Sequence, residues 1–475
     1  MAGTLRYDRG TLTLKERPPE AVIGEFVFDS RVDLWRAPAY KYSAIVKLLR
    51  GQIAANHAPL YKKLELNHAQ SRTPYPHQLE ALEAWKAARG AGLVVLPTGA
   101  GKSYLGLLAI AWAGRSALVV VPTIDLMHQW YAELKAAFPD FPIGLIGGGY
   151  YEPTDLSVAT YDSAAIHAER LGNRFGMLVF DEVHHLPTAF YKPAATFSLA
   201  PYRLGLTATP ERTDLRHTEL QWLVGDLVYR REAAQLAGDV LAPYRLERVH
   251  VELSPAEREA YRKALEERDG FLRVNGISLG NLTGWQEFVM RSAKSESGRR
   301  AMKAHREARR IASAAPAKLR ALEVILTRHA GHKTLIFTED NETAYHISTR
   351  YLIPCLSHQT KVKERQEMLE LFRSGVYRSI VTSKVLNEGV DVPDASVGVV
   401  LSGSSVAREL VQRLGRIIRR AEGKQAVLYE IIARDTREER VSERRRLGVQ
   451  VEALTSQPRL MSLEPVSWDD LGEKE

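Results

Sequence analysis

Short apolar segments alternate with longer amphipathic segments in two separate parts of this 475-residue chain, and this alternation restricts the possible folds severely. In the first part the apolar segments are 93–96, 117–121, 156–159, 177–180 and 203–206, with helix-like segments such as 102–112 and 124–138 between them. In the second part they are 334–337, 379–381, 397–401 and 426–431. Buried strands that alternate with amphipathic helices form parallel sheets covered by helices. The sequence therefore predicts an α/β fold with two parallel-sheet domains.

The segments outside this alternation complete the predicted domain organisation. About three domains fit the length. We expect a small N-terminal α+β domain with a helix over 43–52, a first α/β domain, a helical insertion, a second α/β domain and a tail, over residues 1–70, 71–250, 251–316, 317–455 and 456–475. The N-terminal domain either contacts nucleic acid or packs on the first α/β domain.

The predicted insertion is helix-rich and basic. Residues 294–310 carry seven Lys or Arg and two Glu. Such a run is commonly a solvated helix face, but in a basic protein it is also suited to phosphate contacts, and both interpretations stay open. The net charge of +8 favours a polyanionic partner such as nucleic acid.

Cysteine usage and hydropathy indicate where the protein works. Cys355 is the one cysteine, so an internal disulfide and a cysteine-based zinc site are excluded, and a reducing compartment is expected. No secretory h-region follows Met1, and no run of about 18 apolar residues is present. We therefore expect no membrane segment, and a cytoplasmic, nucleoid-associated protein.

A glycine-rich loop over 96–103 follows a predicted strand and opens a predicted helix, which is the context that a phosphate-binding loop requires. Its glycines let the backbone approach phosphate, and the helix N-terminus supplies N–H donors. Lys102 is expected to reach the β- and γ-phosphates of ATP, and Ser103 to ligate Mg²⁺. Leu96 stands where the general pattern has glycine. The remaining predicted ATP ligands of this loop are Pro97, Thr98, Gly99, Ala100 and Gly101.

Two acidic residues end another predicted buried strand. Asp181 is expected to hold Mg²⁺ through water, and Glu182 to orient or deprotonate the attacking water. His184 either makes an interdomain hydrogen bond without chemistry or links the γ-phosphate site to the second domain. Thr207, Ala208 and Thr209 follow the next strand and are expected to relay a hydrogen-bond change from the acidic pair.

The second α/β part supplies the remaining predicted ATP-site residues. Gly389 permits a tight turn, and Asp391 can meet the ribose or the opposite domain. Gln412, Arg416 and Arg419 are spaced i, i+4 and i+7, so they share one helix face. Beside a nucleotide, arginines on such a face act as fingers that stabilise the transferring phosphoryl group.

In this order the motifs resemble those of superfamily 2 helicases, and more closely those of the XPB family in its compact archaeal and bacterial form. The resemblance covers about residues 72–450 and rests on three strings, which are the loop 96–103 with its leading Leu-Pro, the Asp-Glu-Val-His box at 181–184, and Gln-Arg-Leu-Gly-Arg at 412–416. It implies two RecA-like motor domains that close on ATP and Mg²⁺.

The resemblance also assigns contacts to residues that no other motif covers. Gln78, with Tyr75, is similar to the element that reads adenine. Seven positions are similar to the family's DNA-contact or strand-separating elements: Pro122, Thr123, Thr160, Phe337, Thr338, Arg212 and Asp214. Between the last two, Thr213 replaces the family's glutamate. The insertion stands where the family has a thumb, and residues 1–70 stand where it has a damage-recognition domain.

What the resemblance implies is an ATP-driven motor that moves 3′ to 5′ on single-stranded and forked DNA in repair. We expect a monomer, and the family suggests a nuclease as partner. Three alternatives remain. One is a double-stranded DNA translocase of a restriction or remodelling complex that does not separate strands, and another is an ATP-switched DNA-binding scaffold. The third, an RNA helicase, is disfavoured because the box is not Asp-Glu-Ala-Asp.

Overall fold

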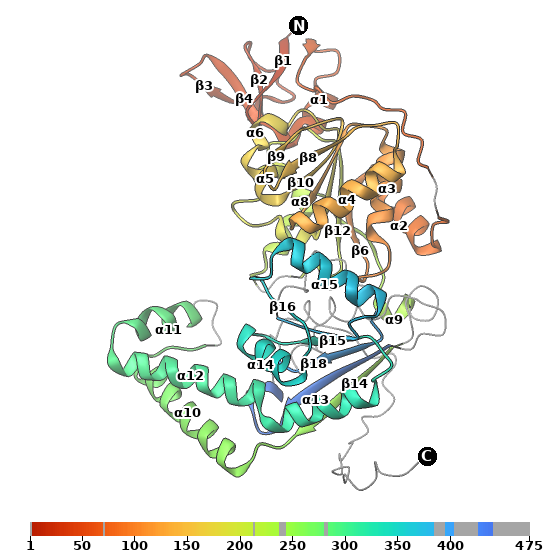
Figure 1. The fold of residues 1–475 in the computed structure, drawn as a ribbon. Helices are drawn as coiled ribbons and strands as arrows, with labels where there is room; N and C mark the ends of the chain where they lie inside the picture. The colour runs from red at the N-terminus through yellow and green to blue at the C-terminus, as the bar shows by residue number, and fades with distance from the viewer. Residues whose placement is uncertain are drawn as a thin grey trace. The chain divides into compact units, whose positions relative to one another are not determined.

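The computed structural model describes residues 2–69, 72–211, 214–236, 244–279, 284–383, 395–402 and 426–439 (Figure 1). The chain divides into two compact units. The described residues up to 236 belong to the first unit and those from 244 to the second. Within these residues, none of the helices is both long and apolar enough to cross a bilayer.

The N-terminal part of the first unit is a small sheet with one α-helix. Its strand order is β3-β4-β2-β1-β5, and helix α1 (Tyr42–Leu48) overlaps the helix predicted over 43–52, beginning one residue before it and ending four residues earlier. Leu5, Leu12 and Ile45 are buried in a common core with Leu199, which belongs to the larger sheet domain. The small domain therefore packs on the first α/β domain, one of the two arrangements predicted. The strands are β1 (Ala2–Asp8), β2 (Thr11–Leu14), β3 (Val27–Asp29), β4 (Leu34–Pro38) and β5 (Ile53–Asn56).

The larger sheet of the first unit has the order β13-β6-β12-β11-β7-β10-β8-β9 over the described residues. Its strand pairs among the described residues are parallel except β8 with β9. The carboxyl ends of the parallel strands consequently share one edge, where α/β proteins place their ligands. The strands are β6 (Ala91–Val95), β7 (Ala117–Val121), β8 (Ile143–Gly147), β9 (Tyr150–Tyr151), β10 (Leu156–Thr160), β11 (Met177–Asp181), β12 (Tyr202–Thr207) and β13 (Leu227–Arg230).

Helices on both sides of the strands form the rest of this domain. They are α2 (Pro76–Ala87), α3 (Lys102–Ala113), α4 (Ile124–Ala137), α5 (Tyr161–Ile166), α6 (Ala168–Leu171), α7 (Pro193–Thr196), α8 (Leu220–Leu223) and α9 (Ala233–Leu236). The five predicted strands and the two named helices are all present, which confirms the α/β fold of this part.

The second unit contains a parallel sheet of order β14-β19-β18-β15-β17-β16 over the described residues. Its strands are β14 (Tyr244–Val251), β15 (Thr334–Phe337), β16 (Cys355–Leu356), β17 (Ser379–Thr382), β18 (Val397–Val400) and β19 (Ala426–Ala433). Strand β14 pairs with β19 along its whole length. Residues 244–250, which were expected in the first α/β domain, therefore belong with the second sheet, because their backbone hydrogen bonds are made there.

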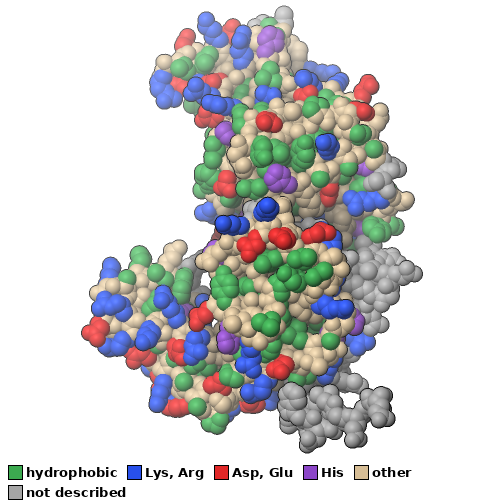
Figure 2. Space-filling model, viewed as in Figure 1, with side chains coloured by type: hydrophobic (Ala, Val, Ile, Leu, Met, Phe, Trp, Pro, Cys, Tyr) green, Lys and Arg blue, Asp and Glu red, His purple; other side chains and the backbone are tan. Residues whose placement is uncertain are grey.

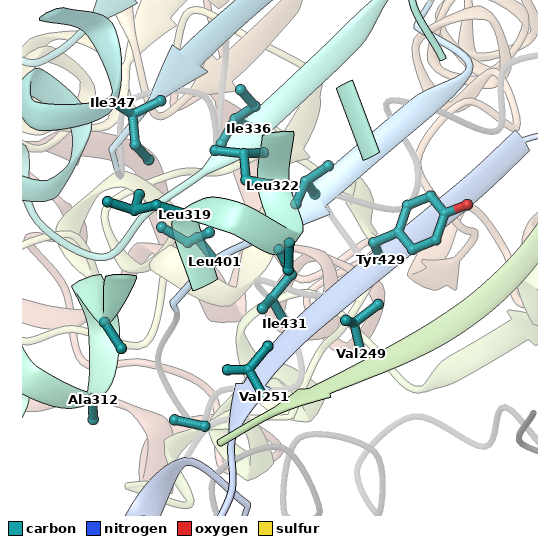
Figure 3. Packing of buried hydrophobic residues seen from close by; sticks show 14 of the residues in the cluster. Val249, Val251, Ala312, Leu319, Leu322, Ile336, Ile347, Leu401, Tyr429 and Ile431 are labelled. Atoms are coloured by element: carbon teal, nitrogen blue, oxygen red, sulfur yellow. The ribbon is translucent and has the colours of Figure 1, made fainter. Parts of the chain in front are cut away.

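The core of the second unit joins this sheet to its helices. Val249 and Val251 of β14 and Ile431 of β19 are buried against Leu319 and Leu322 of α13 (Figure 3). Each fully buried aliphatic side chain stabilises the fold by about 1.5–3 kcal/mol. The helices of this layer are α13 (Pro316–Arg328), α14 (Asn341–Tyr351) and α15 (Val362–Ser374).

Three helices between β14 and α13 form an arm, defined here as residues 255–314. They are α10 (Pro255–Val274), α11 (Gly284–Ala293) and α12 (Glu296–Ala314), and α10 packs along α12 (Figure 1). Phe271, Phe288 and Ala301 belong to a separate small apolar core within the arm. Lys and Arg side chains lie next to Asp and Glu side chains over its surface (Figure 2). The helical character predicted for this segment is confirmed.

Candidate functional site

The carboxyl ends of three neighbouring strands bring together the predicted ATP-site residues of the first unit. Strand β6 runs into the glycine-rich loop, β11 ends at Asp181, and β12 ends at Thr207. The order β6-β12-β11 makes these three ends adjacent. The backbone N–H of Leu96 donates to the carbonyl oxygen of Thr207 at 3.0 Å, which ties the loop to the end of β12.

The loop is built around two glycines in the left-handed region. Gly99 has φ +89° and Gly101 has φ +78°, a conformation that residues with a Cβ adopt rarely. Gly101 is the N-cap of α3, so the free N–H groups of that helix begin directly after it. The hydroxyl oxygen of Thr98 is buried and has no hydrogen-bond partner among the described residues. A bound phosphate would meet N–H groups, this hydroxyl and the positive end of α3.

The ammonium group of Lys102 contacts the loop itself. Its Nζ donates to the carbonyl oxygen of Leu96 at 3.3 Å. This neutral acceptor holds the lysine weakly, so a phosphate can compete for the ammonium group because charge-assisted hydrogen bonds are stronger.

Two side chains of helix α2 contact backbone carbonyl oxygens of the glycine-rich loop. Nε2 of His77 lies 2.9 Å from the carbonyl oxygen of Ala100, and Nε2 of Gln78 donates to the carbonyl oxygen of Gly101 at 3.0 Å. Oε1 of Gln78 accepts from the N–H of Tyr75 at 2.9 Å. Both ends of the Gln78 amide therefore contact backbone groups, and the contact of Gln78 with adenine that the family resemblance implies stays a prediction. The bracing role of His77 was not predicted, and no motif signals it.

Asp181 is a buried carboxylate with both oxygens hydrogen-bonded. Oδ2 accepts from the indole N–H of Trp130 at 2.8 Å, and Oδ1 accepts from the N–H of Glu182 at 3.0 Å. Burial raises the pKa of Asp181, and the charge of Lys102 and these two hydrogen bonds oppose that rise. The contact with Trp130 was not predicted, because it joins residues 51 positions apart.

Glu182 connects the acidic pair to the end of β12. Its backbone is left-handed at φ +48°, which costs a residue with a Cβ on the order of 1 kcal/mol. Its Oε2 lies 3.5 Å from Oγ1 of Thr207 and 3.5 Å from Nδ1 of His184. His184 is fully buried, and its Nδ1 lies 3.1 Å from Oγ1 of Thr207.

The segment after β12 completes this hydrogen-bonded group. The N–H of Thr209 donates to Oγ1 of Thr207 at 3.2 Å, and that hydroxyl lies 3.1 Å from the carbonyl oxygen of Thr209. Ala208, between them, is buried. The structure therefore brings together Glu182, His184 and the Thr-Ala-Thr segment, as a relay requires.

The oxygen ligands predicted for Mg²⁺ suit that ion. Ser103 lies in the first turn of α3 and Asp181 at the end of β11. Among the described residues, no group of three or more His, Cys, Asp or Glu side chains is placed to hold a metal ion. One hydroxyl from Ser103 and one carboxylate from Asp181 fit Mg²⁺, because proteins commonly bind this ion through one or two carboxylates together with substrate phosphates.

The predicted DNA-contact residues of the first unit lie at the same edge of the sheet, on the next strands. Pro122 and Thr123 follow β7, and Thr160 ends β10. The hydroxyl of Thr123 accepts from the N–H of Leu126 at 3.3 Å, and that of Thr160 accepts from the N–H of Ser163 at 3.3 Å. Both threonines therefore cap helices, and a capped helix start still presents backbone N–H groups to a phosphate.

The other predicted DNA contacts differ in accessibility. Phe337 and Thr338 in the second unit are fully buried, and Oγ1 of Thr338 lies 2.9 Å from the carbonyl oxygen of Asp340. Direct contacts of these two side chains with a strand do not fit this burial. Asp214 is exposed and accepts from the N–H of Arg216 at 3.2 Å. Six predicted site residues lie outside the described part of the chain: Arg212, Gly389, Asp391, Gln412, Arg416 and Arg419.

Comparison with protein families covers most of the chain. Residues 5–55 match the xeroderma pigmentosum group B helicase damage recognition domain. Residues 71–212 match the family described as type III restriction enzyme, res subunit, and residues 317–421 match the helicase conserved C-terminal domain. The order of the three matches follows the order of the domains predicted from the sequence.

Individual relatives carry related names. The DNA 3′-5′ translocase XPB2 of Sulfurisphaera tokodaii is 42% identical over 370 residues, which cover 78% of this chain and 84% of that protein. The DNA 3′-5′ helicase XPB of Mycobacterium tuberculosis is 30% identical over 362 residues, which cover 74% of this chain and 59% of that protein. The fold is shared with the Hef helicase domain of Pyrococcus furiosus at a TM-score of 0.50 and 20% identity, over 78% of this chain and 97% of that one. Together, the matched domains and the identity to these relatives show that the chain belongs to the XPB family of superfamily 2 DNA helicases.

Proposed function

We propose that this protein is an ATP-dependent DNA helicase of the XPB type that moves 3′ to 5′ along DNA in repair. The observation that carries the proposal is the convergence of the glycine-rich loop, the Asp181–Glu182 pair and the Thr207–His184 contact at one edge of one parallel sheet. Each of these parts has a defined task in phosphoryl transfer to water.

The geometry of the first unit supports the roles proposed for its residues. Lys102 and the loop N–H groups hold the β- and γ-phosphates. Ser103 and Asp181 hold Mg²⁺, which offsets the charge of the phosphates. Glu182 orients the attacking water. From the sequence alone, Gln412, Arg416 and Arg419 are assigned as donors and positive charges for the transferring phosphoryl group, and Gly389 and Asp391 as residues that approach the ribose.

DNA contacts are proposed for the strand ends beside the ATP site. Strand β7 neighbours β11, which carries Asp181, and β10 lies on the other side of β7. Contacts of backbone N–H groups with phosphates do not depend on base sequence, as a motor requires. A movement of Asp181 or Glu182 can shift these strand ends, because β11, β7 and β10 belong to one hydrogen-bonded sheet. A nuclease partner and a monomeric state remain predictions from the family resemblance.

A second candidate function is translocation on duplex DNA without strand separation. Two findings favour it: residues 71–212 match a restriction-enzyme subunit family, and the 42% identical relative is named a translocase. The replacement of the family's glutamate by Thr213 in a strand-separating element fits the same candidate.

Strand separation and translocation can be measured on one set of substrates. ATP hydrolysis and unwinding are followed on 3′-tailed, 5′-tailed and forked duplexes, and displacement of a third strand is followed on a blunt triplex. The proposal predicts unwinding of 3′-tailed and forked DNA only, with Lys102→Ala as inactive control. Triplex displacement without unwinding of any fork would establish the translocase instead, and preferential unwinding of 5′-tailed DNA would refute the assigned polarity.

A further inference from the structure

Trp130 joins the helix at a predicted DNA-contact site to the carboxylate at the centre of the ATP site. It lies in α4, whose first turn is capped by Thr123, and its side chain is fully buried. Its indole N–H donates to Oδ2 of Asp181 at 2.8 Å, at the end of β11. The other carboxylate oxygen accepts from the backbone N–H of Glu182, so among the described residues the indole is the one side-chain donor that fixes the rotation of this carboxylate.

A glycine in the middle of α3 makes room for this indole. Gly106 lies four residues after Lys102 in the same helix, where glycine costs about 1 kcal/mol relative to alanine. A Cβ at this position would lie 2.6 Å from Cη2 of Trp130, closer than side-chain contacts allow. The helix that opens at the phosphate loop and the helix that opens at the predicted DNA contact therefore touch through one indole ring.

We propose that Trp130 is a positioning residue that holds the Asp181 carboxylate for Mg²⁺-nucleotide binding and couples movement of α4 to that carboxylate. The proposal rests on the ATP site described above and goes beyond it, because no motif gives Trp130 a task there. A shift of α4 on a DNA strand would move the indole N–H relative to Oδ2, and the orientation of the carboxylate would change with it. Residues that orient metal ligands typically change metal affinity by about 10–100-fold when they are replaced.

Two substitutions perturb this contact from opposite sides. Trp130→Phe keeps an aromatic ring but removes the N–H donor. Gly106→Ala keeps the N–H and displaces the ring through the added methyl group. Trp112→Phe is the matched control. Trp112 lies at the end of α3 that is farthest from Lys102, and its side chain is 44% exposed.

The readout is equilibrium binding of a fluorescent ATP analogue with Mg²⁺ and with EDTA. The ratio of analogue affinity in Mg²⁺ to analogue affinity in EDTA is expected to be about 10-fold smaller in both variants than in the wild type. Affinity in EDTA is expected to be the same in all three proteins. Hydrogen exchange over residues 124–137 supplies a second readout, in which Mg²⁺-nucleotide slows exchange in the wild type and not in Trp130→Phe.

The possible outcomes separate this proposal from the proposed function. A wild type that fails to bind the analogue would refute the ATP site itself. Variants that bind the analogue with the full Mg²⁺-dependent gain, and show the wild-type slowing of exchange in α4, would refute the role of Trp130. Circular dichroism establishes that each variant is folded, and either substitution alone suffices for the binding comparison.

Discussion

At the scale of single residues, the ATP site combines groups that are fixed with one that is free to move. Asp181 is buried with both oxygens bonded, and Glu182 has a strained backbone. Lys102 rests on a carbonyl oxygen at 3.3 Å and can be drawn to a phosphate. A rigid acidic pair and a movable cation fit a site that must bind, hydrolyse and release a nucleotide in turn.

Lys102 and Arg416 should differ in which step they support. Lys102→Ala is expected to weaken ATP binding and abolish hydrolysis, because the lysine contacts the phosphates throughout. Arg416→Ala is expected to lower the rate of hydrolysis by about 10³-fold or more while ATP binding stays largely intact, because an arginine finger acts on the transition state. Single-turnover hydrolysis and analogue binding measure the two effects. Wild-type hydrolysis in Arg416→Ala would refute the finger assignment.

His305 in the arm should make stability depend on pH. Burial, helped by the charges of Arg268 and Arg309, lowers its pKa from 6.5 to about 4. Because the folded pKa lies below the unfolded one, the unfolded chain binds the proton more readily, and stability falls as pH drops from 6.5 towards 4. At pH 5 the loss should be roughly 1–2 kcal/mol after solvent screening.

Calorimetry at pH 7.5 and pH 5 tests this dependence. The difference between the two melting temperatures should shrink in His305→Phe and stay at its wild-type value in the control His346→Asn, since His346 is exposed. An equal difference in wild type and His305→Phe would show that His305 contributes nothing to the acid sensitivity.

At the scale of elements, the central strands were predictable and the edge strands were not. Segments 117–121 and 334–337 are continuous apolar runs and form β7 and β15 with the predicted bounds. Strand β14 was missed because its sequence mixes Arg245, Glu247 and Arg248 with apolar residues. Its place beside β19 depends on pairing with residues about 180 positions away, which local pattern does not encode.

In the candidate ATP site, too, the residues in contiguous motifs were predictable and the contacts between distant residues were not. The phosphate loop and the acidic pair are contiguous strings whose chemistry can be predicted directly from residue types. The contact of Trp130 with Asp181 and the bracing by His77 depend on how α2, α3 and α4 pack, and the sequence carries no spacing rule for them. The backbone partners of Gln78 likewise depend on the packing of α2 against the loop, and its contact with adenine stays a prediction.

The arm should contribute phosphate contacts through one face of α12. Lys303 and Arg306 are exposed and form no salt bridge within the described residues, whereas Arg310 pairs with Glu307 at 2.7 Å. Replacing both Lys303 and Arg306 by Ala should reduce the slope of log affinity for single-stranded DNA against log salt by about 1.4. Fluorescence anisotropy at several salt concentrations measures the slope.

Arg310→Ala is the control for the arm, because its guanidinium is already paired. Its salt slope should match that of the wild type. If the double variant also keeps the wild-type slope, the basic face of α12 is a solvated helix face, which is the other interpretation of this segment.

At the scale of the whole molecule, the small N-terminal domain is held on the first α/β domain by specific contacts. The hydroxyl of Tyr7 donates to the carbonyl oxygen of Phe197 at 3.0 Å, and the rings of Tyr40 and Trp222 are 5.6 Å apart. Burial raises the pKa of Tyr7 to about 12, so its hydroxyl stays a donor at all physiological pH values. Such contacts fix the orientation of the N-terminal domain on the first α/β domain.

Tyr7→Phe should loosen this attachment without unfolding either domain. The loss of the hydrogen bond is expected to cost about 1 kcal/mol, and limited proteolysis between residues 57 and 69 should become faster. Tyr150→Phe is the control, because Tyr150 is 48% exposed. Equal cleavage rates in the wild type and Tyr7→Phe would show that the hydroxyl does not hold the two domains together.

The central claim is that DNA binding and ATP hydrolysis are coupled in this chain. The most direct measurement is the steady-state rate of ATP hydrolysis with and without single-stranded DNA, for the wild type and for Glu182→Gln. DNA is expected to accelerate hydrolysis by the wild type, and Glu182→Gln is expected to hydrolyse ATP at less than about one hundredth of that rate. A wild-type rate that DNA leaves unchanged would contradict the claim.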